Sequence, residues 1–431
     1  MYTNNMYTIK NIGDLIKYER IRQNMKQITL CKGICSPSYL SKIENNSADP
    51  SPELISLLLK RLNINPEEYR IQKESEFEFL KELDEIYKET VINRDKNFAR
   101  EKLDYLTGTT FYYTGETLFQ LILVIAKLYL SLDELEPIRG KIEFLYSKSS
   151  GLSKKQRYLL HKIEGIYYYK LKNHGKALAK LMKADKLLNE LNVPAWERAD
   201  LHYCLGLAFA VLGQTYNAIE NTKKSLDSFK DYFLYNRAID CYILLGICYN
   251  RMKLHREALE IYDLALKIIN DLNLEGLKGK IFHNLGSIYS FLDPKKSIEY
   301  FEKSLHLKKS TSDKLASVLS IIEEYSKANH WKKVKEWIKE GERFIECHPD
   351  NFDSFRHHFA IYKELSGKQY VTDKTVTPAI EHFEREGSYD ACYKYSLMLA
   401  DSLFKRGKYK LSALHYKKAH HYYLKSGGGV L

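Results

Sequence analysis

The chain has 431 residues and a formal net charge of +12, long enough for several domains or for one extended array of repeats. Glycine (21) and proline (9) are few while Leu, Lys, Glu and Tyr are abundant, so we expect an all-α protein. The charge suits an anionic partner but does not say which one. The most apolar run, residues 118–132, contains Gln120 and Lys127 and is shorter than the roughly 20 residues of a bilayer span, so we expect no membrane partner. The odd number of cysteines (7) and the lack of a signal peptide favour a cytoplasmic protein.

Residues 25–46 (MKQITLCKGICSPSYLSKIENN) have the pattern of two short helices joined by a tight turn. Gln27 begins the first helix, Gly33 permits a sharp turn, and Ser36 stands where the N-cap of the second helix belongs. The residues spaced to face a core are Leu30, Cys31, Ile34, Leu40 and Ile43, and those left on the outer side are Ser38, Tyr39, Lys42 and Asn45. This pattern predicts a helix-turn-helix whose second helix enters the major groove of DNA.

Three further helices complete a compact N-terminal domain, which we place at residues 8–72. The first is predicted over residues 12–23, with Ile12, Leu15, Ile16 and Ile21 facing inward. The fourth begins at Pro52, and a short fifth helix follows Asn65.

The motif resembles the Cro/repressor-type helix-turn-helix of bacterial and phage regulators. In that family an arginine of the first helix pairs with the glutamate that ends the recognition helix, and Arg20 and Glu44 occupy those places. The resemblance puts Ser36, Pro37, Ser38 and Lys42 at base edges and Gln27 and Asn45 on phosphates, although Pro37 can make only an apolar contact. The alternative is that the hydroxyls of Ser36 and Ser38 are exposed to solvent and contact no base. The predicted DNA-binding set is Gln27, Ser36, Pro37, Ser38, Tyr39, Lys42, Asn45 and Asn46.

A repeat follows the N-terminal domain. Four glycines stand 41, 40 and 40 residues apart, each with an aromatic residue three positions later: Gly165, Gly206, Gly246 and Gly286. Small residues recur twelve positions after the first three glycines, at Ala177, Ala218 and Ala258. The pattern resembles the tetratricopeptide repeat, in which small residues let paired helices approach closely. With weaker copies on both sides, it predicts roughly eight helix pairs stacked as a right-handed superhelix with a concave inner wall. We expect a helical connector and first repeat at 73–110, the array at 111–425 and a flexible tail at 426–431.

No constellation of catalytic residues is evident in the sequence. It contains no HExxH, no Walker-type glycine loop, no GxSxG and no GxGxxG. The adjacent pairs His357-His358, His420-His421 and Glu323-Glu324 point about 100° apart on a helix, so none forms a chelating face. We therefore expect a protein that is not an enzyme and that has no metal and no cofactor.

A concave helical wall is suited to an extended peptide, whose backbone needs both donors and acceptors. Asparagine side chains offer one of each, and tyrosines offer flat contact area. Counted from the glycines, the predicted peptide-binding residues are Tyr203, Asp240, Ile247, Asn250, His283, Asn284 and Ser287. Asn250 and Asn284 are the predicted peptide clamps; the alternative is that they cap or bridge helices.

A Cro-type domain followed by this array resembles the RNPP family of peptide receptors, and its NprR-like branch in particular. That resemblance implies a cytoplasmic quorum-sensing regulator of transcription from Gram-positive bacteria. Its implied partners are a double-stranded DNA operator, a short signalling oligopeptide, further copies of itself in a dimer or tetramer, and a response regulator. Two alternatives stay open: a Rap-like protein that binds a sporulation response regulator, and a peptide-independent phage or plasmid repressor.

Overall fold

The computed structural model describes residues 12–65, 76–109, 113–347 and 352–426, in which the regular structure is entirely helical. The chain divides into two compact units, Met1–Leu201 and His202–Leu431. Unit 1 contains α1 (Ile12–Arg22), α2 (Gln27–Cys31), α3 (Pro37–Glu44), α4 (Pro52–Arg61), α6 (Glu76–Ile92), α7 (Lys96–Gly108), α8 (Gly115–Ser131), α9 (Glu136–Ser147), α10 (Lys154–Lys170) and α11 (His174–Leu188). The unit boundary lies in α12 (Ala195–Val211). Unit 2 continues with α13 (Thr215–Asp231), α14 (Tyr235–Arg251), α15 (His255–Asp271), α16 (Lys278–Leu292), α17 (Pro294–Leu307), α18 (Thr311–Lys327), α19 (Trp331–Glu346), α20 (Asp353–Lys368), α21 (Asp373–Arg385), α22 (Tyr389–Lys405) and α23 (Tyr409–Lys425).

The first four helices enclose a small apolar core, which includes Leu15, Leu30, Leu40 and Leu58. The helices begin at Gln27 and Pro52 as predicted, and α1 ends one residue earlier than expected. The inward orientation predicted for Ile21 is wrong, because this side chain is 46% exposed. Ile21 stands about 200° around the helix from the buried Glu19, so it falls on the opposite face of α1. The predicted fifth helix and most of the predicted tail lie outside the described residues.

Helices α1 and α3 touch at a glycine that the sequence pattern did not single out. A Cβ on Gly13 would lie 1.8 Å from the carbonyl oxygen of Ile43, so only glycine fits at this point. The backbone of the recognition helix is thereby held directly against α1.

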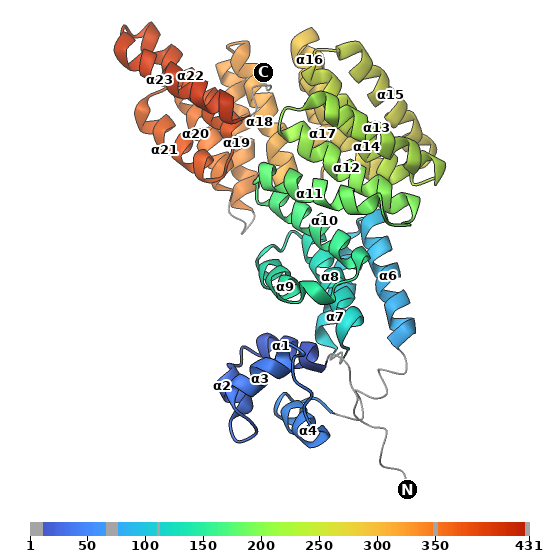
Figure 1. Cartoon of the computed structure of the whole chain (residues 1–431). Coiled ribbons are helices and arrows are strands. Elements are labelled where there is room, and N and C mark those ends of the chain that lie inside the picture. The colour runs from blue at the N-terminus through green and yellow to red at the C-terminus, as the bar shows by residue number, and fades with distance from the viewer. Residues whose placement is uncertain (1–11, 66–75, 110–112, 348–351, 427–431) are drawn as a thin grey trace. The chain divides into compact units, whose positions relative to one another are not determined.

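The remaining described helices form nine pairs, from α6–α7 to α22–α23, where roughly eight were predicted. Successive helices pack side by side, as α16–α17 and α22–α23 do in Figure 1. The all-α fold class, a helix-turn-helix unit followed by a tetratricopeptide-type array, is confirmed. The predicted domain boundaries near residues 72 and 110 fall within or beside undescribed segments and stay predictions.

The repeating glycines mark the places where the two helices of a pair come closest. A Cβ on Gly246 would lie 2.3 Å from the Tyr262 ring, and one on Gly286 would lie 2.7 Å from Phe301. Gly165 and Gly206 face Leu181 and Thr222 in the same way. In each pair the glycine of the first helix thus provides space for one side chain of the second.

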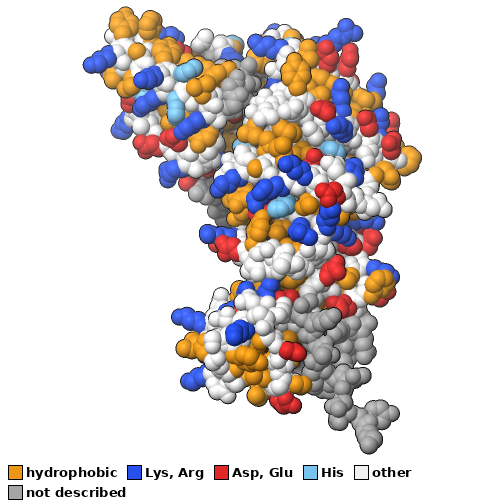
Figure 2. Space-filling view, viewed as in Figure 1, with side chains coloured by type: hydrophobic (Ala, Val, Ile, Leu, Met, Phe, Trp, Pro, Cys, Tyr) orange, Lys and Arg blue, Asp and Glu red, His pale blue; other side chains and the backbone are white. Residues whose placement is uncertain are grey.

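Positive charge is dispersed over the face of the molecule that Figure 2 shows. Figure 2 shows Lys and Arg side chains scattered across the visible face, with Asp and Glu side chains among them. This agrees with the charge distribution along the sequence, where the excess of basic residues is not gathered in one segment.

We expect Gly246→Ala to destabilise unit 2 by about 1–3 kcal/mol, because the added methyl group overpacks a buried contact. Tyr262 is 0% exposed, and three of its ring and hydroxyl atoms would lie within 2.7 Å of the new Cβ. The measurement is the urea midpoint of the full chain. The matched control is Gly175→Ala in α11, where a Cβ meets nothing within 4 Å and the helix propensity of alanine should leave stability unchanged or slightly higher. Equal midpoints for the two variants would contradict the packing role of Gly246.

Candidate functional site

The second helix of the helix-turn-helix, α3, presents its polar side chains to solvent. Ser36 is its N-cap, because the Ser36 hydroxyl accepts a hydrogen bond of 3.2 Å from the backbone N–H of Tyr39. Pro37 occupies the first helical position, where its missing N–H costs nothing. Ser38, Lys42 and Asn45 are exposed, while Leu40 and Ile43 are buried. The local sequence therefore produces a short helix with one face in the core and one face available to a ligand.

A bidentate ion pair holds this helix to the preceding ones. Arg20 donates from Nε to Glu44 Oε1 at 2.5 Å and from Nη2 to Glu44 Oε2 at 2.9 Å. Gln27 donates a third hydrogen bond to Glu44 at 2.8 Å, so the Gln27 amide is used within the unit. The Glu44 side chain is only 1% exposed, and these three donors satisfy its buried charge.

The end of α3 is also bound to the first repeats of the array. The Asn46 amide accepts from the backbone N–H of Gly13 at 3.1 Å and donates to Asp14 at 2.8 Å. Lys148, which follows α9, forms a 2.7 Å ion pair with Asp14 and donates to the carbonyl oxygen of Glu44. A cation at this carbonyl complements the negative end of the helix dipole. The sequence pattern singled out neither Lys148 nor Asp14, because their contact joins residues more than a hundred positions apart.

Unit 2 contains a cavity of about 800 Å³ lined by residues of five consecutive helices, α14 to α18. From the first helices of three successive pairs, it receives Ile247, Asn250 and Arg251 of α14, Asn284, Ser287, Ser290 and Phe291 of α16, and Ser320, Glu323, Glu324 and Lys327 of α18. The second helices contribute the aromatic residues Tyr262 and Phe301, which face the repeat glycines. The lining of the cavity thus combines amide, hydroxyl, charged and aromatic groups.

Four of the seven residues predicted for peptide binding line this cavity: Ile247, Asn250, Asn284 and Ser287. The Asn250 amide oxygen lies 3.0 Å from Nδ1 of His255, and Asn284 hydrogen-bonds to the buried Tyr262 hydroxyl, whose pKa is raised by burial. Both amides therefore also bridge helices, as the alternative interpretation of these residues foresaw.

The other three predicted residues are not among those lining the cavity. Tyr203 is 7% exposed, and the Arg237 guanidinium lies 5.1 Å from the centre of its ring. Asp240 lies 3.6 Å from the same guanidinium. His283 packs 5.2 Å from the Phe301 ring, and burial lowers its pKa to about 4.

The charged groups of the cavity were missed by sequence reasoning. Glu323 forms an ion pair of 2.5 Å with Lys394 of α22, and Glu324 binds Lys327 at 2.7 Å and the Ser290 hydroxyl at 2.6 Å. The two adjacent glutamates face different lysines, which agrees with their angular separation on the helix. Their position in the cavity depends on how α16, α18 and α22 pack, so no local pattern marks it.

Within the described residues, no group of three or more His, Cys, Asp or Glu side chains is arranged to hold a metal ion. Among the same residues, no helix combines the length and the apolar character that crossing a membrane requires.

Comparisons with known proteins match both parts of this architecture. A helix-turn-helix family model matches residues 16–69, and a tetratricopeptide repeat model matches residues 242–310. The chain is 29% identical over 407 residues to the transcriptional activator NprA of Geobacillus stearothermophilus, covering 91% of this chain and 98% of that protein. Both parts and their order are similar to those of the RNPP family of transcriptional regulators. The order of domains in this chain is NprR-like.

Solved structures agree with this fold. A Rap protein complexed with competence and sporulation factor aligns with a TM-score of 0.68 at 18% identity, covering 83% of this chain and all of that one. NprR in complex with its cognate peptide NprX aligns with a TM-score of 0.59 at 17% identity, covering 80% of this chain and 97% of that one. At these identities the likeness concerns the fold alone.

We expect Arg20→Met to destabilise the helix-turn-helix unit by about 3 kcal/mol, because it leaves the buried Glu44 carboxylate without its main partner. The double variant Arg20→Met/Glu44→Met should recover part of this loss, since no lone charge then remains buried. Thermal unfolding of the full chain, followed by a probe in the first unit, measures both. A double variant no more stable than the single one would argue against a charge effect.

Proposed function

We propose that this protein is an RNPP-type regulator that binds a specific DNA operator through α3 and a short signalling oligopeptide in the unit 2 cavity. Peptide binding changes the oligomeric state of the protein and its affinity for DNA. The observation that carries the proposal is the pairing of a solvent-facing reading helix with a cavity in which successive first helices supply amide and hydroxyl groups. The protein acts in the cytoplasm, where operator and imported peptide meet.

The DNA contacts follow from the exposed face of α3. Ser36, Pro37, Ser38 and Lys42 contact base edges or the adjoining backbone, and Asn45 lies beside the phosphates. Tyr39, which was predicted on the outer side, is half-buried against the core of the unit, so only its exposed part can reach DNA. Gln27 and Asn46 already make contacts within the unit, so they act chiefly by positioning the helix. One such helix reads about half of a two-fold site, and a full operator therefore requires a dimer or a tetramer of the chain.

The peptide contacts follow from the composition of the cavity. Its volume of about 800 Å³ lies within the usual range for ligand sites, about 300–1,000 Å³. Asn250 and Asn284 each present a donor and an acceptor to an extended backbone, while Ile247 and Phe291 contact side chains. NprR, which shares this fold, is known in complex with its cognate peptide, and this supports the same class of ligand here.

The switch requires that the peptide favour one conformation of the array over another. A ligand shifts such an equilibrium only by its differential affinity for the two states. Two ion pairs involve glutamates that line the cavity, Glu323–Lys394 and Glu324–Lys327, and their rearrangement would provide that difference. Binding of a response regulator by the array would be a separate activity, tested by retention of purified response regulators on the immobilised protein.

The proposed DNA contacts of α3 can be tested by substitution. Ser38→Ala should weaken operator binding by about 1–3 kcal/mol if the hydroxyl contacts a base edge. Lys42→Ala should weaken it and, if Lys42 contacts a phosphate, lower the slope of log K against log salt by about 0.9. Operator titrations at several salt concentrations measure both effects. The control is Lys333→Ala, an exposed lysine of α19 that pairs with Glu336. Wild-type affinity in both α3 variants would mean that the contacts are misassigned.

The proposed peptide contacts of the unit 2 cavity can be tested in the same way. Asn250→Ala and Asn284→Ala should each weaken peptide binding by about tenfold, because each removes a donor and an acceptor from a buried backbone contact. Calorimetric titration with a library of synthetic five- to eight-residue peptides provides the measurement, with light scattering to follow mass. Asn217→Ala is the matched control, since this asparagine is exposed on α13 outside the cavity. If no peptide changes the mass, thermal stability or operator affinity of the wild-type chain, the switch does not exist.

A further inference from the structure

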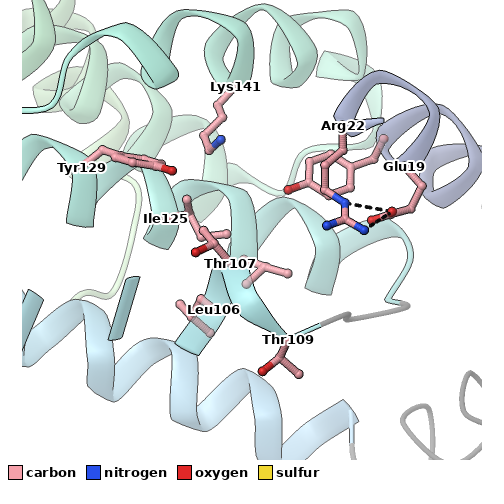
Figure 3. Close-up of a pocket in the computed structure, with 10 residues that line it drawn as sticks. Glu19, Arg22, Leu106, Thr107, Thr109, Ile125, Tyr129 and Lys141 are labelled. Carbon is pink, nitrogen blue, oxygen red and sulfur yellow. Dashed lines mark hydrogen bonds and ion pairs between the residues drawn. The ribbon is translucent and has the colours of Figure 1, made fainter. Parts of the chain in front are cut away.

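A second cavity, of about 220 Å³, lies in unit 1 between α1 of the helix-turn-helix and α7, α8 and α9 of the first repeats. It is smaller than the usual range of ligand sites, about 300–1,000 Å³, so only a small molecule fits. Figure 3 shows Lys141 pointing from α9 toward Ile125 and Tyr129 of α8, with Arg22 and Glu19 of α1 on the other side. The cavity is therefore bounded by both parts of unit 1.

The ammonium group of Lys141 is the unusual feature of this cavity. It lies 5.2 Å from the centre of the Tyr129 ring, and burial lowers its pKa. No carboxylate of the described residues lies within ion-pair distance of it. The one carboxylate at the cavity, Glu19, is bound by Arg22 at 2.9 Å from Nε and 2.7 Å from Nη2. Glu19 and Arg22 thus balance each other, and the charge of Lys141 remains uncompensated.

An uncompensated ammonium group in a partly desolvated site favours an anion. Tyr18 and Tyr129 also line the cavity. Burial raises the pKa of Tyr18 to about 12 and that of Tyr129 as well, so both hydroxyls keep their protons and can donate. Leu121 and Ile125 supply an apolar wall. One cation and two hydroxyl donors beside an apolar wall match a carboxylate that carries a short aliphatic tail.

We propose that this cavity binds a small aliphatic carboxylate and thereby fastens the helix-turn-helix to the first repeats. The anion contacts α1 and α7–α9 at once, and α1 in turn touches α3 at Gly13. It therefore stabilises the same arrangement in which Lys148 binds Asp14 and the carbonyl oxygen of Glu44. The anion is thus a second ligand, with a site separate from the peptide cavity of unit 2. Binding of the anion does not depend on the proposed DNA-binding and peptide-binding activities.

The test titrates the full chain with sodium butyrate and follows heat release and thermal stability, with sodium chloride at equal ionic strength as the blank. We expect saturable binding and a rise in the melting temperature of the wild type. Butyramide, which has the same shape without the charge, should bind at least tenfold more weakly. Equal binding of butyramide and butyrate, or a response that never saturates, would overturn the proposal.

Variants locate the site. Lys141→Met keeps the aliphatic stem and should abolish the butyrate response, while Lys141→Arg should retain part of it. Tyr129→Phe should weaken butyrate binding by about tenfold. This variant provides a second test of the site if Lys141→Met fails to fold. The matched control is Lys155→Met, an exposed lysine of α10 in the same unit that pairs with Asp84 and should respond as the wild type does. An unchanged butyrate response in both Lys141→Met and Tyr129→Phe would exclude this cavity as the site.

A carboxylate could also come from the end of a peptide chain. Titration with N-acetyl-Ala-Val, as the free acid and as the amide, separates the two sources. Binding of butyrate alone identifies a free metabolite-sized acid, and binding of the peptide acid but not its amide identifies a chain terminus. Both outcomes support the carboxylate site, whereas equal binding of peptide acid and amide would contradict it.

Discussion

The close approach of paired helices at a glycine is the constraint on which the array depends. At Gly246 and Gly286 there is no room for a Cβ, because the ring of Tyr262 or Phe301 fills the space. A helix pair that packs this closely buries an aromatic side chain against the glycine, and the buried ring gives the pair its relative position. The same two rings border the unit 2 cavity, so the packing that builds the repeat also builds part of the candidate ligand site.

The buried carboxylates Glu44 and Asp14 of the helix-turn-helix unit each have several donors. Glu44 receives three hydrogen bonds from Arg20 and Gln27, and Asp14 is bound by Lys148 and Asn46. These two carboxylates are thus satisfied by donors from other segments of the chain, which is the condition for keeping such a group ionised inside a protein. Lys141 does not follow this rule among the described residues, and this contrast is what makes its cavity a candidate anion site.

The two cavities differ in the way their polar groups are balanced. In unit 2 the glutamates of α18 already have lysine partners, and the amides of Asn250 and Asn284 already bridge neighbouring helices. A peptide entering there must exchange existing contacts for new ones, which couples binding to rearrangement. In unit 1 an anion would add an opposite charge to Lys141, which has no carboxylate partner among the described residues, so binding would consolidate an existing arrangement.

The sequence by itself determined the elements whose signals are local. The serine cap before Pro37, the spacing of Leu30, Leu40 and Ile43, and the recurring glycines are carried by residues close together in the chain, and the described helices follow them. The Ile21 prediction failed because it relied on the apolar character of this residue. Its position on the helix places it on the exposed face of α1. Only the tertiary structure decided which of the seven predicted wall residues share a cavity, and it brought Lys148 to Glu44 and Glu323 to Lys394. These contacts join distant segments, and their geometry depends on small rotations accumulated from helix to helix, which no local pattern of residues encodes.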